Sequence, residues 1–190
     1  TVYAGGPVTV MGGKVRKRIA APDAATGLAT AWNPSVNSNI YDKVMAIAVD
    51  GSTVYAGGSF STVGGLARNN LVAVDATTGL VTAWNPNVNA PVASLAVGGS
   101  TVYAGGEFSA AGGQSRSRVA ALDAATGQAT AWNPGANGVV DALLLHGAVL
   151  YTGGNFTSIG GSTRNRLAAL DVATGAPSAA WDANSSTSAS

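Results

Sequence analysis

The side chains best suited to catalysis are scarce in this sequence. His146 is the only histidine, Glu107 is the only glutamate, and there is no cysteine. A glycosidase needs two carboxyl groups at a defined separation, and covalent catalysis needs a nucleophile beside a base. His146 lies in the turn Leu145-His146-Gly147, where no such partner pattern surrounds it. We therefore predict that the chain is not an enzyme and that it binds neither a cofactor nor a metal.

Three residue types recur at matching positions along the chain. They are the arginines Arg16, Arg68, Arg116 and Arg164, the aspartates Asp23, Asp75, Asp123 and Asp171, and the tryptophans Trp32, Trp84, Trp132 and Trp181. A charge that returns in every copy of a repeat indicates a structural need that every copy has. A guanidinium donates several hydrogen bonds at once, so we expect each arginine to form an ion pair between units or to clamp loop carbonyls. Multivalent anion binding is the alternative.

The aspartates and tryptophans also have a structural and a binding interpretation. Each aspartate opens a segment such as Asp123-Ala-Ala-Thr-Gly127, in which the carboxylate caps the backbone and the glycine supplies a positive φ. One aspartate per turn does not supply the several oxygens that calcium requires, so we interpret the aspartates as turn caps. A ring of tryptophans could stack on sugars. We favour instead their burial against paired glycines such as Gly57-Gly58, which let a ring approach closely.

These residues belong to an internal repeat. The string Thr-Val-Tyr-Ala-Gly-Gly starts at Thr1, Thr53 and Thr101 and returns in altered form at Val149, with spacings of 52, 48 and 48 residues. Each copy contains four short strand-like runs, which are residues 92–97, 102–108, 119–122 and 129–132 in the copy that is easiest to read. Short strands separated by Gly, Asn, Asp and Pro at this period are typical of a β-propeller.

We therefore predict an all-β chain that forms a β-propeller of four tandem units, each of about 48 residues and four antiparallel strands. Residues 1–190 would be one repeat array, with units that start near residues 1, 53, 101 and 149 and a serine-rich tail at 183–190. The first unit contains a short insertion, Asn37 to Lys43. Because binding usually resides in variable loops on a rigid scaffold, we predict that Tyr41, Asp42 and Lys43 form a distinctive contact.

The repeat resembles several known types. Tyr55-Ala-Gly57-Gly58, followed by Leu71 to Asp75 and Trp84, resembles a kelch-type repeat. The stretch from Leu122 through Gly127 to Trp132 is similar to the quinoprotein blade motif, with four residues between Gly and Trp in place of three. The pattern Gly-Gly, Phe, Gly-Gly, Arg, Leu-Ala-Ala-Leu-Asp, Thr-Gly, Trp-Asn-Pro most resembles the delta-60 repeats of large secreted bacterial proteins. That resemblance covers nearly the whole chain and implies an extracellular or cell-surface location.

Composition limits the remaining function classes. Hydrophobic residues make up 46% of the chain, charged residues 10%, and the net charge is +1. The weak charge gives no basis for binding nucleic acid, and no run of 18 apolar residues predicts a membrane span. We expect a non-catalytic scaffold or adhesive binding module of a secreted or surface bacterial protein. The alternatives are a lectin-like propeller that binds carbohydrate and a non-catalytic part of a larger extracellular enzyme.

The expected partners are other blades and an external ligand. The chain opens within a repeated motif without a starting methionine, which indicates a processed protein or a piece of a longer one. The array either closes into a four-bladed ring or pairs its ends with other blades of the same or a second chain, and we favour the second outcome. A protein or a glycan would be the external ligand.

Overall fold

The computed structural model describes residues 1–36 and 41–183, and these residues form strands and turns without a helix. Three successive units each contain a three-stranded antiparallel sheet. The second unit contains β5 (Lys43–Asp50), β6 (Thr53–Ser59) and β9 (Leu71–Asp75), and the third contains β10 (Val92–Gly98), β11 (Thr101–Gly106) and β14 (Val119–Asp123). The fourth contains β15 (Val140–His146), β16 (Val149–Gly154) and β19 (Leu167–Asp171), and the corresponding sheet of the first unit has two described strands, β1 (Ala4–Gly5) and β4 (Ile19–Ala20).

The loop before the last strand of each sheet carries a small additional hairpin, which the four strand-like runs of the sequence do not include. In unit order these hairpins are β2–β3 (Val10–Met11 and Lys14–Val15), β7–β8 (Thr62–Val63 and Leu66–Ala67), β12–β13 (Ala110–Ala111 and Gln114–Ser115) and β17–β18 (Ser158–Ile159 and Ser162–Thr163). A glycine pair closes each turn. Gly64 and Gly65, for example, have φ values of 58° and 79°, a region that glycine adopts at little cost.

The fourth expected strand is shorter than the sequence indicates. Residues 129–132 contribute only the isolated bridge between Leu122 and Ala129, and the other units have one equivalent bridge each. In the second unit the Thr82 hydroxyl donates to the Ala73 carbonyl at 3.1 Å and accepts from the Trp84 amide at 3.3 Å. The Ala73 carbonyl thus accepts from both the amide and the hydroxyl of Thr82, the amide at 3.0 Å, beside the single bridge between Val74 and Val81.

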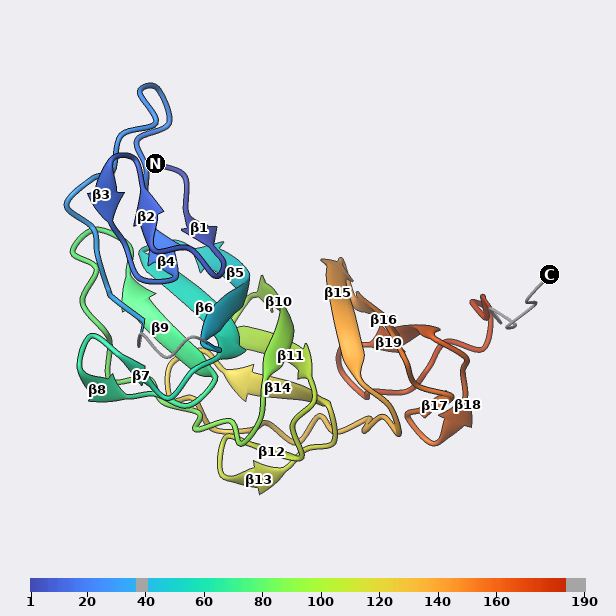
Figure 1. Ribbon diagram of the computed structural model, residues 1–190. Helices are drawn as coiled ribbons and strands as arrows, with labels where there is room; N and C mark the ends of the chain where they lie inside the picture. Colours follow the sequence, from blue (N-terminus) through green and yellow to red (C-terminus); the bar gives the residue numbers. More distant parts are fainter. Residues whose placement is uncertain (37–40, 184–190) are drawn as a thin grey trace.

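Successive sheets pack face to face and form an open arc, with the first and fourth units at its opposite ends (Figure 1). The hydrophobic core lies at the unit boundaries. One buried cluster joins Tyr55 and Leu71 of the second unit to Val102, Phe108 and Leu122 of the third. Among residues 1–36 and 41–183, no strand of the first unit pairs with a strand of the fourth. The all-β propeller architecture is confirmed.

A valine of each following unit sits above a glycine of the preceding one. An ideal Cβ atom on Gly57 would lie only 2.6 Å from Val92 Cγ1, and Gly5 and Gly105 face Val44 and Val140 in the same way. The expectation that a tryptophan occupies the space over the glycine pair is wrong. Gly57 accepts the valine, whereas Gly58 lies against the carbonyl of Lys43 on the neighbouring strand of its own sheet. The close approach of two sheets excludes a Cβ atom at Gly57.

The aspartate turns have one hydrogen-bond pattern in all four units. The Asp75 carboxylate accepts from the amides of Thr77 and Thr78 at 3.0 and 2.7 Å and from the Thr78 hydroxyl at 2.7 Å. The hydrogen bond from the Thr78 amide is the main cause of the lowered pKa of Asp75. The hydrogen bond from the Thr126 hydroxyl is the main cause of the lowered pKa of Asp123. The pKa values of Asp23 and Asp171 are also lowered by their turn threonines, Thr26 and Thr174.

A matched pair of alanine substitutions tests whether the close approach of Val92 requires a glycine at position 57. Gly57→Ala should lower the free energy of unfolding by about 1 to 3 kcal/mol, because Val92 has to move. Gly153 occupies the equivalent position in the fourth unit, where the nearest atoms to an ideal Cβ lie 3.4 Å away or more. Gly153→Ala should therefore change the free energy by less than about 0.5 kcal/mol. Urea denaturation measures both, and equal losses would contradict the proposed reason for the glycine.

The aspartate turns predict acid sensitivity. Since the folded pKa values lie below the unfolded value of about 3.9, the turns stabilise the fold above that pH, and this contribution disappears as pH falls through the folded values. The urea midpoint should therefore decrease below about pH 4. In the double variant Asp75→Asn/Asp123→Asn, the side-chain amide oxygen can still accept these hydrogen bonds but does not titrate. The decrease of the urea midpoint with falling pH should therefore be shallower. An unchanged slope would show that other carboxyl groups control acid unfolding.

Candidate functional site

The recurring tryptophans lie at the boundaries between units. Trp84 packs edge-on against Tyr55 of its own unit, with ring centroids 5.2 Å apart, and its Nε1 donates to the Asp123 carbonyl of the next unit at 3.0 Å. Trp32 and Trp132 repeat this arrangement on the carbonyls of Asp75 and Asp171 at 2.9 and 3.0 Å. Each of these aspartates thus caps its own turn with its carboxylate and accepts an indole from the preceding unit with its backbone.

Burial separates the last tryptophan from the other three. Trp32, Trp84 and Trp132 are 4%, 5% and 6% exposed, whereas Trp181 is 37% exposed. Trp181 keeps the edge-on contact with Tyr151, at 5.4 Å between ring centroids. In the described part of the chain, no indole bond to a following unit is found at Trp181, and its ring is the most exposed of the four.

The recurring arginines bind carbonyls of their own units. Arg68 donates to the carbonyls of Ala67 and Thr82 at 2.8 and 2.7 Å, so it joins the hairpin to the segment before the tryptophan. Arg16 and Arg116 make the equivalent bonds and are 7% and 8% exposed. Of the arrangements considered from the sequence, the geometry is that of a carbonyl clamp and not of an ion pair between units.

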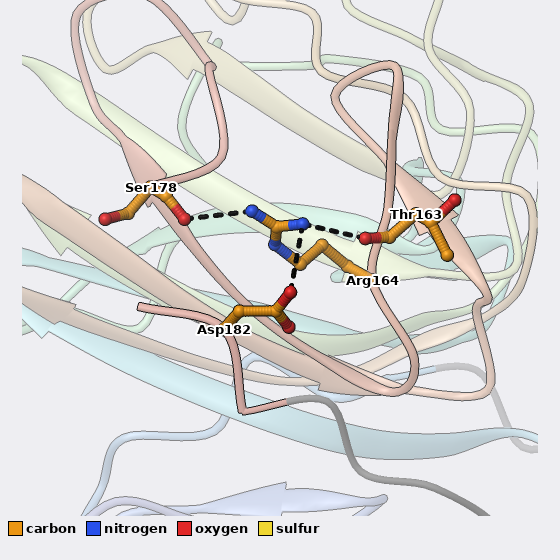
Figure 2. A network of polar contacts seen from close by, with 4 residues as sticks. All are labelled: Thr163, Arg164, Ser178 and Asp182. Atoms are coloured by element: carbon orange, nitrogen blue, oxygen red, sulfur yellow. Dashed lines mark hydrogen bonds and ion pairs between the residues drawn. The ribbon is translucent and has the colours of Figure 1, made fainter. Parts of the chain in front are cut away.

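The fourth arginine has one additional contact. Figure 2 shows Arg164 between the carbonyls of Thr163 and Ser178, at 2.8 and 3.0 Å, with the Asp182 carboxylate 3.4 Å away. Asp182 occupies the position of Asn33, Asn85 and Asn133 in the other units. The charge pair therefore depends on a residue that departs from the repeat.

Two other recurring features were not found from the sequence. Asn89 and Asn137 reach across a unit boundary, and Asn89 Oδ1 accepts from the amides of Ser109 and Ala110, both at 3.0 Å. A left-handed backbone also recurs at Arg18, Asn70, Arg118 and Arg166, with φ between 62° and 68°. The recurring Asn-Pro-x-x-Asn spacing could have indicated the first feature. Arginine gives no local signal for a positive φ, so the second required the structure.

The residues predicted to form a distinctive contact lie at the start of β5. Tyr41 is 77% exposed, Asp42 is half-buried and Lys43 is exposed. The remainder of the predicted insertion, residues 37–40, lies outside the described residues, as do residues 184–190 of the serine-rich tail.

The hairpins of the first two units carry exposed apolar side chains. Val10, Val15 and Leu66 are 60%, 67% and 48% exposed. At the positions of Val15 and Leu66, the hairpins of the third and fourth units carry only polar residues, namely Gln114, Ser115, Ser162 and Thr163. These apolar residues are therefore not required by the repeat.

Two hollows on the surface are formed by the repeat itself. A groove of about 640 Å³ lies between the first and second units, beside Tyr3 and Trp32, and has Thr30, Ser52 and Thr77 in its lining. A hollow of about 340 Å³ covers the outer face of the fourth unit and is bordered by Leu144, Tyr151, Gly153, Leu167 and Trp181. The first has hydroxyl groups around aromatic rings, and the second is lined mainly by apolar side chains.

Catalytic and metal-binding constellations were sought among the described residues. Glu107 and His146 are both exposed, and they lie on different units. In residues 1–36 and 41–183, no group of three or more His, Asp or Glu side chains is arranged to hold a metal ion. The same residues contain no helix with the length and hydrophobicity that a membrane crossing needs.

The tryptophan contacts predict unequal effects of two substitutions. Trp84→Ala should lower the free energy of unfolding by about 3 to 5 kcal/mol, as expected when a buried aromatic ring is removed. Trp181→Ala should cost well under half of that, because its indole is already partly exposed. Thermal and urea denaturation measure both changes. An unchanged stability of Trp84→Ala together with lost sugar binding would instead favour the carbohydrate interpretation.

Comparisons with known structures agree with the fold. The chain is similar to the computationally designed Ika8 protein, with 17% identity, a TM-score of 0.55, and coverage of 84% of this chain and 41% of the designed one. It also matches the computationally designed Ika4 protein, with 17% identity, a TM-score of 0.49, and coverage of 71% and 69%. A comparison with curated proteins found no match. The chain thus spans less than half the length of the Ika8 protein.

The family comparison covers almost the whole repeat array. Residues 1–181, which include all four tryptophans and all four carbonyl clamps, match the profile of one family of β-propeller repeats. This chain belongs to that family, PQQ_2, which is described as "Outer membrane protein assembly factor BamB".

Proposed function

We propose that this chain is a non-catalytic β-propeller module that binds another protein through the hairpins and loops of its first two units. The observation that carries this proposal is the break in the repeat at Val10, Val15, Leu66 and Tyr41. The propeller does not need an apolar side chain at Val15 or Leu66, since the third and fourth units have polar residues at these two hairpin positions. Exposed apolar side chains without a structural role are typical of protein contacts.

The family description supports a partner that is a protein. An assembly factor acts by contacting other proteins, and the family with that description is the one this chain belongs to. The fold also supports it, because loops on a rigid scaffold can vary without loss of stability. We further propose an extracellular or cell-surface location and an adhesive or scaffolding role. The resemblance to delta-60 repeats motivates both.

One observation favours carbohydrate binding as a second candidate function. The groove beside Tyr3 and Trp32 offers the hydroxyls of Thr30, Ser52 and Thr77, which could bond a sugar. Against it, Trp32 is only 4% exposed, so its ring offers little surface for stacking. A glycan array on the purified chain tests this candidate, and specific binding that a Thr77→Val variant abolishes would favour it over the protein partner.

Site-specific photocrosslinking tests the protein contact. A photoreactive amino acid would replace Val15, Tyr41 or Leu66, with matched controls at Gln114 and Ser162 on the other two hairpins. In extracts of the source cells, we expect one discrete protein adduct from the first three positions and none from the controls. Leu66→Asp should remove the adduct formed at position 15 and leave the melting temperature unchanged, because Leu66 is 48% exposed. Adducts of equal yield at all five positions, or none, would contradict the proposal.

A further inference from the structure

The hairpin of the first unit carries a concentration of positive charge that the other hairpins do not have. Residues 14–18 read Lys-Val-Arg-Lys-Arg and contain four of the ten basic side chains of the sequence. Asp23 is the only acidic residue within residues 1–36, although the whole sequence has nine acidic residues and a net charge of +1. The matching segment of the third unit, residues 114–118, has the two arginines Arg116 and Arg118 and no lysine. The additional charge is therefore not required by the repeat.

Two of the four basic side chains are available to a partner. Lys14 and Lys17 are exposed, and neither forms an ion pair among the described residues. Arg16 is 7% exposed and donates to the carbonyls of Val15 and Thr30. Because these carbonyls are neutral, the guanidinium adds its charge to the field of the two lysines. The hairpin thus presents two exposed ammonium groups with a third, buried positive charge close by.

The exposure of Lys14 and Val15 follows from their position in the repeat. Residues 66–67 hold the same two positions in the second unit, and residues 114–115 hold them in the third. Both of these units pack against a neighbouring unit on each side, and all four residues are nevertheless exposed. The packing of units therefore leaves these two hairpin positions open to a partner.

The hairpins of the first and second units are fixed next to each other by the segment between them. The Val36 amide donates to the Lys17 carbonyl at 3.2 Å, and the Ser35 carbonyl accepts the Gly64 amide at 3.1 Å. The exposed side chains of the two hairpins therefore belong to one continuous surface. We define this basic hairpin surface by its residues, which are Lys14, Val15, Lys17, Leu66 and Ala67.

We propose that the basic hairpin surface binds an acidic segment of another protein, in which carboxylates alternate with apolar side chains. Carboxylates of that segment pair with Lys14 and Lys17, and its apolar side chains cover Val15 and Leu66, which are 67% and 48% exposed. Complementary charge speeds the encounter with such a segment, and like charge disfavours a basic one. The inference rests on the proposed function, because it names the chemistry of the protein that the first two units bind.

An anionic membrane surface is also negatively charged, but it fits this surface less well. Lipid-binding clusters typically contain about 4 to 8 basic residues. On this hairpin only Lys14 and Lys17 are exposed, since Arg16 and Arg18 are each 7% exposed. The apolar side chains lie on two separate hairpins and not along one face of an amphipathic helix, which is the usual interfacial element. The charge and the shape therefore favour a protein segment.

Fluorescence anisotropy of the 190-residue chain with three labelled synthetic peptides tests the proposal. One peptide alternates glutamate with leucine, the second alternates lysine with leucine, and the third alternates glutamate with serine. The chain should bind the glutamate–leucine peptide about tenfold more tightly than either of the others, which corresponds to about 1.4 kcal/mol. This affinity should decrease when the salt concentration rises from about 0.1 M to about 1 M, because the Debye length falls from about 10 Å to about 3 Å.

Two double variants with the same change in net charge locate the contact. Lys14→Gln/Lys17→Asn introduces the residues that hold these positions in the third and second units, and it should weaken binding of the glutamate–leucine peptide about tenfold. Gln114→Glu/Ser117→Glu lowers the net charge equally on the hairpin of the third unit and is the matched control. It should bind the peptide like the unchanged chain. Both variants should keep the melting temperature, because none of the four side chains is buried.

The possible outcomes separate this inference from the proposed function. Equal binding of the three peptides, or equal losses in the two double variants, would overturn the acidic partner. Crosslinked adducts at Val15 and Leu66 that persist in about 1 M salt and in Lys14→Gln/Lys17→Asn would overturn it as well, but they would leave the proposed function in place. Selective peptide binding without any adduct would contradict the proposed function alone. Binding of the chain to phosphatidylserine vesicles, without binding of the glutamate–leucine peptide, would replace the protein segment with a membrane.

Discussion

The packing of one sheet upon the next is the constraint on which the rest of the molecule depends. The main sheet of each unit has only two or three described strands, so a single unit cannot bury both of its faces. The sheets approach closely because a valine of one unit sits over a glycine of the preceding one, as Val92 does over Gly57. The glycine is costly within a strand, but it lets the adjoining sheet bury its apolar surface.

The polar groups at the unit boundaries follow from the same close packing. Where the backbone leaves the sheet after its third strand, the carbonyls need donors, since buried polar groups are costly when unpaired. The indoles and arginines supply them. Trp84 donates across the boundary to Asp123, and Arg68 donates within the unit to Ala67 and Thr82. Residues that could be taken for a binding array therefore satisfy the backbone.

Departures from the repeat have two different origins in this chain. Some lie on hairpins, where Val15 and Leu66 replace polar residues without any change in the local backbone. Others concern burial alone, as with Trp181 and Val2, whose residue types match their counterparts although their exposure does not. The first kind differs in sequence, and the second differs only in surroundings. Both expose apolar surface, but only the first could have been recognised from the residues themselves.

The sequence by itself determined the strand content, the repeat length and the turn chemistry, because these depend on neighbouring residues. Gly, Asp and Thr at fixed offsets specify the turn at Asp123 to Gly127 wherever it occurs. The tertiary structure decided what each recurring side chain contacts. A valine and not a tryptophan fills the space over Gly57, and the fourth strand is reduced to a bridge. Trp181 is partly exposed, whereas its counterpart Trp132 is buried. Val92 lies 35 positions after Gly57, and the exposure of Trp181 depends on what packs beside it, so no local pattern of residue types records either outcome.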